Sequence, residues 1–160
     1  MKELFPPLKE KRVLDLGCGY GWHCKYAAGQ GAGRVLGIDL SQKMLEEAGR
    51  RSADDVITYR PCSIEEYEYP ENSWDVVISN LALHYIEDLD NVFRNVKRTL
   101  RHGGTFLFSI EHPTFTAGVG QDWVYGPDGA PEYWPVDNYY LPGMRETYFL
   151  DAEYKNTTIL

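Results

Sequence analysis

The sequence predicts an α/β fold built on a mainly parallel sheet, and three observations indicate that class. Short apolar runs typical of strands alternate with segments of helical periodicity along residues 12–110. Residues 12–39 contain a strand, a glycine-rich loop, room for a short helix and a second strand, which together make a βαβ unit. The run at 76–78 is continuously apolar, as in strands that are buried on both faces of a parallel sheet.

The loop at residues 17–21, with the sequence GCGYG, follows the apolar run at 13–16 directly, where a first strand has to turn. Glycine has no Cβ, so the backbone of such a loop can approach a ligand at the N-terminus of the next helix. Asp39 ends the second apolar run and can accept hydrogen bonds from ribose hydroxyls. Loop and acid together predict a nucleoside site, whereas the simpler alternative is a tight turn followed by a solvated strand end.

The spacing of the glycines indicates which nucleoside to expect. A dinucleotide fingerprint needs G-x-G-x-x-G, but Trp22 occupies the third glycine position, and no lysine follows the loop as a P-loop requires. The run VLDLGCGYG, with Asp15 before the loop, resembles the first motif of the class I S-adenosylmethionine-dependent methyltransferases. This resemblance implies methyl transfer from S-adenosylmethionine, with S-adenosylhomocysteine as product, and a Rossmann-like three-layer sandwich with strand order 3-2-1-4-5.

Composition limits the other function classes. The chain has 160 residues, 43% of them hydrophobic, which is enough for one domain but short for a complete doubly wound sheet. A net charge of -8 argues against a nucleic-acid partner, which clustered basic residues would bind. The three cysteines form no C-x-x-C pair, which predicts reduced thiols in a cytoplasm and no metal site. Because the chain lacks a leader and a long apolar run, we also expect no membrane partner.

The next two elements extend the resemblance. Ser41 is a candidate N-cap for a helix that reaches residue 51, and 56–60 has the character of a third strand. By resemblance, Leu40 and Met44 flank the adenine, Ser63 accepts a hydrogen bond from its amino group, and the backbone of Ile64 meets the ring. The residues expected to bind the cofactor are Asp15, Gly17, Cys18, Gly19, Asp39, Leu40, Met44, Ser63, Ile64 and Asn80.

The fourth and fifth strands place titratable residues at one edge of the sheet. The fourth, around 76–78, leads into residues 80–85 at its carboxyl end, the edge at which open α/β sheets hold ligands. An amphipathic helix follows over 89–100, and we expect it to end at the glycines of 101–104. The fifth strand, 105–110, is followed by Glu111-His112-Pro113 at the same edge.

Methyl transfer demands few catalytic residues, because the cofactor carries the activation and the protein mainly aligns the reactants. For a hydroxyl or an acidic carbon, a base is useful, and His84 and His112 are the candidates. Asn80, Tyr85 and Glu111 are weaker candidates for orienting the acceptor. The alternative is that both histidines only cap loops or bond to the backbone.

Residues 114–160 change in character, since glycine, proline and aromatic residues recur there without clear periodicity. We expect an irregular aromatic cap within the same domain as 1–113, with short strands at 146–150 and 157–160. Its aromatic side chains either line a pocket for a small acceptor or pack the cap onto the sheet. Because the resemblance ends near residue 113, the chain is either a fragment or its open sheet edge is covered by the cap or by a second copy in a homodimer.

The acceptor is expected to be a small molecule. The segment after the fourth strand lacks the N/D-P-P-Y pattern of enzymes that methylate planar nitrogens, and Pro61-Cys62 reverses the order found in cytosine C5 enzymes. Two alternatives stay open. One is a NAD-dependent oxidoreductase on the same fold, against which Trp22 is the main evidence, and the other is a catalytically inert nucleoside-binding fragment.

Overall fold

The computed structural model describes residues 2–112, 114, 122–137, 139, 143–149 and 154–159. Its internal contacts divide the chain into two units. The first comprises Met1–Leu83 and Asp88–Ser109, and the second comprises His84–Glu87 and Ile110–Leu160. The second unit is therefore formed by two segments that follow neighbouring strands of the first.

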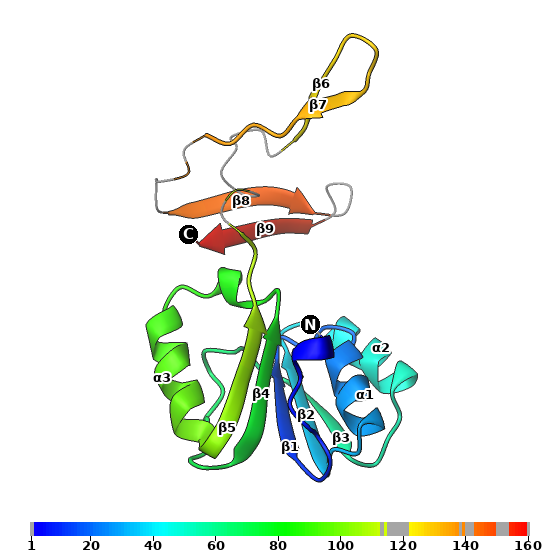
Figure 1. Cartoon of the computed structure of the whole chain (residues 1–160), viewed down its shortest axis with the longest axis vertical. Helices are drawn as coiled ribbons and strands as arrows, with labels where there is room; N and C mark the ends of the chain where they lie inside the picture. Colours follow the sequence, from blue (N-terminus) through cyan, green and yellow to red (C-terminus); the bar gives the residue numbers. More distant parts are fainter. Residues whose placement is uncertain are drawn as a thin grey trace. The chain divides into compact units, whose positions relative to one another are not determined.

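A sheet of five parallel strands in the order β3-β2-β1-β4-β5 forms the first unit (Figure 1). The strands are β1 (Arg12–Leu16), β2 (Arg34–Asp39), β3 (Ile57–Pro61), β4 (Trp74–Asn80) and β5 (Leu100–Ser109). The helices are α1 (Trp22–Gly29), α2 (Gln42–Arg51) and α3 (Leu89–Thr99), with short 3₁₀ turns η1 (Lys2–Leu4) and η2 (Leu83–Tyr85). The predicted fold class and strand order are confirmed.

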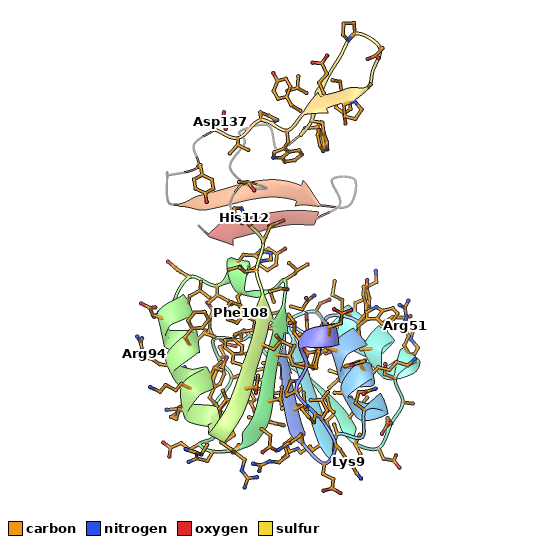
Figure 2. The ribbon with its side chains drawn as sticks, in the orientation of Figure 1. Lys9, Arg51, Arg94, Phe108, His112 and Asp137 are labelled. Carbon is orange, nitrogen blue, oxygen red and sulfur yellow. The ribbon has the colours of Figure 1, made fainter. Side chains whose placement is uncertain are left out.

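Three layers result, because α1 and α2 lie on one face of the sheet and α3 lies on the other (Figure 1). On the first face, Val13 and Val35 pack in one cluster with Cys24 of α1 and Leu45 of α2. The alternate side chains of the strands, such as Leu14, are equally buried, so both faces of the sheet are covered. Polar residues such as Arg94 of α3 point away from the sheet (Figure 2). Among the described helices, none combines the length and apolarity needed to cross a bilayer.

The end of α3 differs from the prediction of a glycine terminus at 101–104. The helix ends at Thr99, and β5 begins at once with Leu100. The carbonyl of Thr99 accepts the N–H of Ser73 at 2.7 Å, so the turn before β4 satisfies a helix end that a glycine cap otherwise serves. Gly103 still has a φ of +76°, but it lies inside β5.

The second unit contains two antiparallel strand pairs. β6 (Val124–Tyr125) pairs with β7 (Pro131–Tyr133), and β8 (Met144–Phe149) pairs with β9 (Tyr154–Ile159). β8 and β9 correspond to the strands predicted at 146–150 and 157–160, whose last residues, Leu150 and Leu160, lie outside the described residues. Pro113, predicted to follow the fifth strand, also lies outside them.

Candidate functional site

The loop between β1 and α1 turns through three glycines in the left-handed region. Gly17, Gly19 and Gly21 have φ values of +72°, +51° and +74°. The backbone N–H groups of Gly17 and Cys18 both donate to the carbonyl of Ile38 at 2.9 Å, which fixes the start of the loop against β2. The loop is therefore a defined bend and not a flexible linker.

The three glycines serve two different purposes. A Cβ on Gly17 would lie 2.5 Å from the Cβ of Ala82, and one on Gly21 would lie 2.8 Å from Cζ of Tyr59, so packing alone excludes a side chain at both. A Cβ on Gly19 would meet, among the described atoms, only Sδ of Met44 at 4.0 Å. Gly19 thus faces open space, as expected of a loop that a ligand approaches closely.

Asp39 ties this loop to the helix that follows β2. Its Oδ2 accepts the N–H of Gly19 and its Oδ1 accepts the N–H of Ser41, both at 2.9 Å. Ser41 in turn caps α2, because its Oγ accepts the N–H of Met44 at 3.3 Å, as predicted. The carboxylate is only half-buried, and each oxygen has further lone pairs with which to accept hydroxyl donors.

Asp15 lies at the end of β1 and is 1% exposed. Its Oδ2 accepts from Sγ of Cys24 at 3.4 Å, whereas its Oδ1 has no hydrogen-bond partner among the described residues. Burial raises the pKa of Asp15 to about 7, and the nearby charge of Asp39 adds to that shift. An orphaned carboxylate oxygen close to the loop fits a ligand that brings a cationic hydrogen-bond donor.

The other residues of the first unit that were predicted to bind the cofactor differ in how available they are to a ligand. Leu40 is 76% exposed and so is available to a ligand. Ile64 lies beside the loop, with its Cδ1 3.6 Å from a Cβ built on Gly17. Oγ of Ser63 already accepts the N–H of Glu66 at 3.0 Å.

Two further predicted residues have side chains that are engaged within the protein. Oδ1 of Asn80 accepts from Oγ of Ser109 at 2.8 Å, which links the ends of β4 and β5. The buried thiol of Cys18 lies against β2, 2.8 Å from a Cβ built on Gly37. The backbone N–H of Cys18 donates to Ile38 and its carbonyl accepts from Gly21, so Cys18 shapes the loop through its own internal bonds.

Sequence reasoning missed Gly37 and Tyr59, which pack against the side chains and backbone of the loop. A Cβ on Gly37 would lie 2.8 Å from Sγ of both Cys18 and Cys24, and 3.0 Å from Cδ1 of Tyr59. Burial raises the pKa of the Tyr59 hydroxyl. A glycine inside an apolar strand is a signal of close approach, and it could have pointed to this packing.

The two candidate bases belong to the second unit. His84 is 4% exposed; its Nδ1 accepts the N–H of Glu111 at 3.5 Å, and its Nε2 lies 3.8 Å from Oε2 of the same residue. Burial lowers the pKa of His84 and raises that of Glu111. His112 is exposed, and its Nδ1 lies 2.9 Å from Oγ1 of Thr114. The structure therefore pairs His84 with Glu111, not with His112.

A five-stranded sheet in this order, with a glycine loop anchored by an acid on β2, defines a nucleoside-binding α/β domain. Residues 14–108 match the family model described as "Methyltransferase domain". The chain belongs to this methyltransferase family.

Individual relatives agree with this assignment. A proposed S-adenosylmethionine-dependent methyltransferase from Listeria monocytogenes is 44% identical, and the match covers 99% of this chain and 73% of that chain with a TM-score of 0.89. An uncharacterized protein of Haemophilus influenzae is 40% identical over 77% of this chain and 51% of its own length. The malonyl-[acyl-carrier protein] O-methyltransferase of Erwinia pyrifoliae is 39% identical over 61% of this chain and 36% of its own length.

The chain spans about half or less of these last two relatives. The family match confirms the predicted enzyme class, a methyltransferase, and the solved relative agrees with the predicted cofactor, S-adenosylmethionine.

Proposed function

We propose that the chain binds S-adenosylmethionine over the loop at 17–21 and transfers its methyl group to a small-molecule acceptor. The observation that carries this proposal is the open space at Gly19 beside a carboxylate, Asp39, that already holds the backbone of the loop. When bound, the cofactor supplies an electrophilic methyl group on a sulfonium. The chain therefore has to bind the cofactor, orient the acceptor toward the methyl group and exclude water.

The residues around the loop fit the chemical groups of this cofactor. The remaining lone pairs of Asp39 accept from ribose hydroxyls, and the orphaned Oδ1 of Asp15 accepts from the ammonium group. The exposed side chain of Leu40 and the thioether of Met44 give apolar contact to the adenine. The expected set of cofactor-binding residues is completed by Ser63, Ile64 and Asn80. Ser63 and Asn80 each make an internal hydrogen bond, and they would contact the cofactor through the lone pairs and protons that this bond does not use.

Replacing Asp39 by alanine is expected to weaken binding of S-adenosylhomocysteine by about 1–3 kcal/mol, because a charged acceptor and an anchor of the loop are both lost. Isothermal titration calorimetry measures this directly. Asp55→Ala, which removes an exposed carboxylate elsewhere in the unit, should leave the affinity unchanged. Equal affinities in the two variants would exclude the ribose role.

The same titration distinguishes the competing activities. Wild-type protein is expected to bind S-adenosylmethionine and S-adenosylhomocysteine but not NAD, because Trp22 replaces the glycine that a dinucleotide loop requires. Tight NAD binding without binding of the sulfonium would favour the oxidoreductase. Binding of the cofactor without turnover of any acceptor would favour the inert nucleoside-binding fragment.

We further propose that His84 and His112 belong to the acceptor side of the reaction. Both follow the strands β4 and β5 in the chain, and both carry nitrogen atoms that hydrogen-bond within the second unit. The acceptor is proposed to be a small molecule, as no basic surface for a nucleic acid is expected from a net charge of -8.

A homodimer in the cytoplasm is the proposed state of the chain. β5 is the last strand in the order of the described sheet, so we expect its outer edge to offer backbone groups for pairing, and the side chain of Phe108 in this strand is 43% exposed. The three cysteines are free, in keeping with a reducing compartment. Sedimentation analysis should therefore detect a dimer that Phe108→Glu weakens. A monomer at every concentration would contradict the proposal.

A further inference from the structure

The two carboxylate oxygens of Asp15, at the end of β1, are in different situations. Oδ2 accepts a hydrogen bond from Sγ of Cys24 at 3.4 Å, whereas Oδ1 has no partner among the described residues. Asp15 is 1% exposed and Cys24 is fully buried, so water has little access to the bonded pair. The thiol of Cys24 therefore determines which oxygen of Asp15 is open to a ligand.

The thiol of Cys24, in the first turn of α1, is the donor of this bond because a carboxylate has no proton to give. The pKa of Cys24 lies well above its ordinary value, first because of its hydrogen bond with Cys18 and then because of burial. The thiol thus keeps its proton at neutral pH. A hydrogen bond donated to a carboxylate favours the charged form.

Four titratable side chains surround Asp15, and none of the four is a cation. They come from β2, the glycine loop, α1 and β3, and they are Asp39, Cys18, Cys24 and Tyr59. Burial raises the pKa of Asp15, the bond from Cys24 acts in the opposite direction, and the charge of Asp39 raises the pKa further. Among these neighbours, Cys24 is therefore the group that favours an ionised Asp15.

We propose that Cys24 is a positioning residue for the cofactor: its thiol holds Oδ2 of Asp15, which keeps the carboxylate ionised and leaves Oδ1 open to the cofactor's ammonium group. This inference rests on the proposed methyl transfer. In this arrangement Asp15 contacts the ligand, and Cys24 acts through Asp15 without touching the ligand.

The role of Cys24 predicts a characteristic pH dependence of cofactor binding. The pKa of Asp15 is about 7 in the ligand-free chain, so below that pH an ammonium ligand competes with a proton for the carboxylate. Affinity should therefore increase as pH rises through about 7. Loss of the thiol favours the proton, so it should weaken binding below pH 7 and leave binding intact well above it. A simple packing defect would weaken binding at every pH.

Calorimetric titration with S-adenosylhomocysteine, which retains the ammonium group, tests this dependence at pH 6 and pH 8.5. Cys24→Ala should bind about two- to tenfold more weakly than wild type at pH 6, the usual scale of one hydrogen bond, and equally at pH 8.5. Cys24→Val fills the space without a donor and should behave in the same way. Cys24→Ser keeps a donor and should recover part of the affinity.

A core variant controls for packing. Val35 is fully buried in the same cluster as Cys24 and has no polar group. Val35→Ala should lower the free energy of unfolding but keep the wild-type ratio of affinities at the two pH values. The titration of the ligand's own ammonium group is common to all variants, so it cancels from this comparison.

A ligand without the ammonium group tests where Cys24 acts. 5′-Methylthioadenosine shares the nucleoside and the thioether with S-adenosylhomocysteine but lacks the amino acid part. Its affinity should be the same in wild type and Cys24→Ala at both pH values. Equal losses for the two ligands would mean that Cys24 supports the nucleoside part of the site, and the proposal would be wrong.

Nuclear magnetic resonance of ¹³C-labelled aspartate carboxyl groups tests the bond without any ligand. The signal of Asp15 is the one that Asp15→Asn lacks. The pKa of Asp15 should be higher in Cys24→Ala and Cys24→Val than in wild type, because the donor that favours the carboxylate is gone. The same pKa in all three chains would overturn the role of Cys24.

The two levels of failure are distinguishable. If the wild-type chain bound neither S-adenosylhomocysteine nor 5′-methylthioadenosine, the proposed function would be wrong, while the magnetic resonance result still judged the bond between Cys24 and Asp15. If both ligands bound, with the same pH dependence in wild type and Cys24→Ala, the role of Cys24 alone would be wrong.

Discussion

Gly19→Ala is expected to weaken S-adenosylmethionine binding by about 10- to 100-fold while the chain stays folded. The new methyl group would enter the space above the loop, where only Met44 comes within 4.0 Å among the described atoms. It would therefore meet the ligand and not the protein, and overpacking of this kind costs about 1–3 kcal/mol. Calorimetric titration gives the affinity, and urea unfolding gives the stability.

Two matched variants separate binding from folding. Gly103→Ala introduces a methyl group at a similar φ of +76° into open space within β5, so it reports the backbone strain alone and should leave the affinity intact. Gly17→Ala places its Cβ 2.5 Å from that of Ala82 and should reduce the free energy of unfolding. If Gly19→Ala bound the cofactor as well as Gly103→Ala does, no ligand would approach the loop at this position.

Asp15→Asn is expected to stabilise the ligand-free chain at pH 8 by as much as about 4 kcal/mol. The pKa of Asp15 is about 7 in the folded chain, against an ordinary value of 3.8, and each unit of difference corresponds to about 1.4 kcal/mol. Between these two values the folded chain binds the proton and the unfolded chain does not. The wild-type free energy of unfolding should therefore decrease as pH rises from about 4 to about 7, and the Asn variant should lack that decrease.

Urea unfolding at pH 4 and pH 8 measures the difference. Wild type and Asp15→Asn should be similar at pH 4, where both side chains are neutral, and should diverge at pH 8. Asp55→Asn, at an exposed position, should follow the wild type at both values. Since Asp15 is also the proposed partner of the cofactor's ammonium, the more stable variant should bind the cofactor less tightly. Equal stabilities at pH 8 would show that Asp15 is not buried as an acid.

The fold could be predicted because its signals are local. Each strand of the sheet is a short apolar run, and the loop at 17–21 combines three glycines with an acid 20 residues beyond Gly19. Ser41 is predictable as a cap because its side chain bonds to the backbone only three residues further along the chain. These features need no knowledge of distant contacts.

The rest depended on contacts between residues far apart in the sequence. The end of α3 is satisfied by Ser73, which no local pattern around 101–104 reveals. The support of the loop by Tyr59 depends on how β3 lies beside β2. The sequence identifies both histidines as candidate bases, but the pairing of His84 with Glu111 follows only once β4 and β5 are known to be neighbours.

The bond from Asp39 to the backbone of Gly19 also concerns the kinetics of ligand capture. This hydrogen bond holds the bend in one defined conformation, so little conformational entropy is lost when a ligand binds. The association rate is then limited by diffusion and orientation, and differences in residence time, not in the speed of arrival, should separate ligands that share the same adenosine.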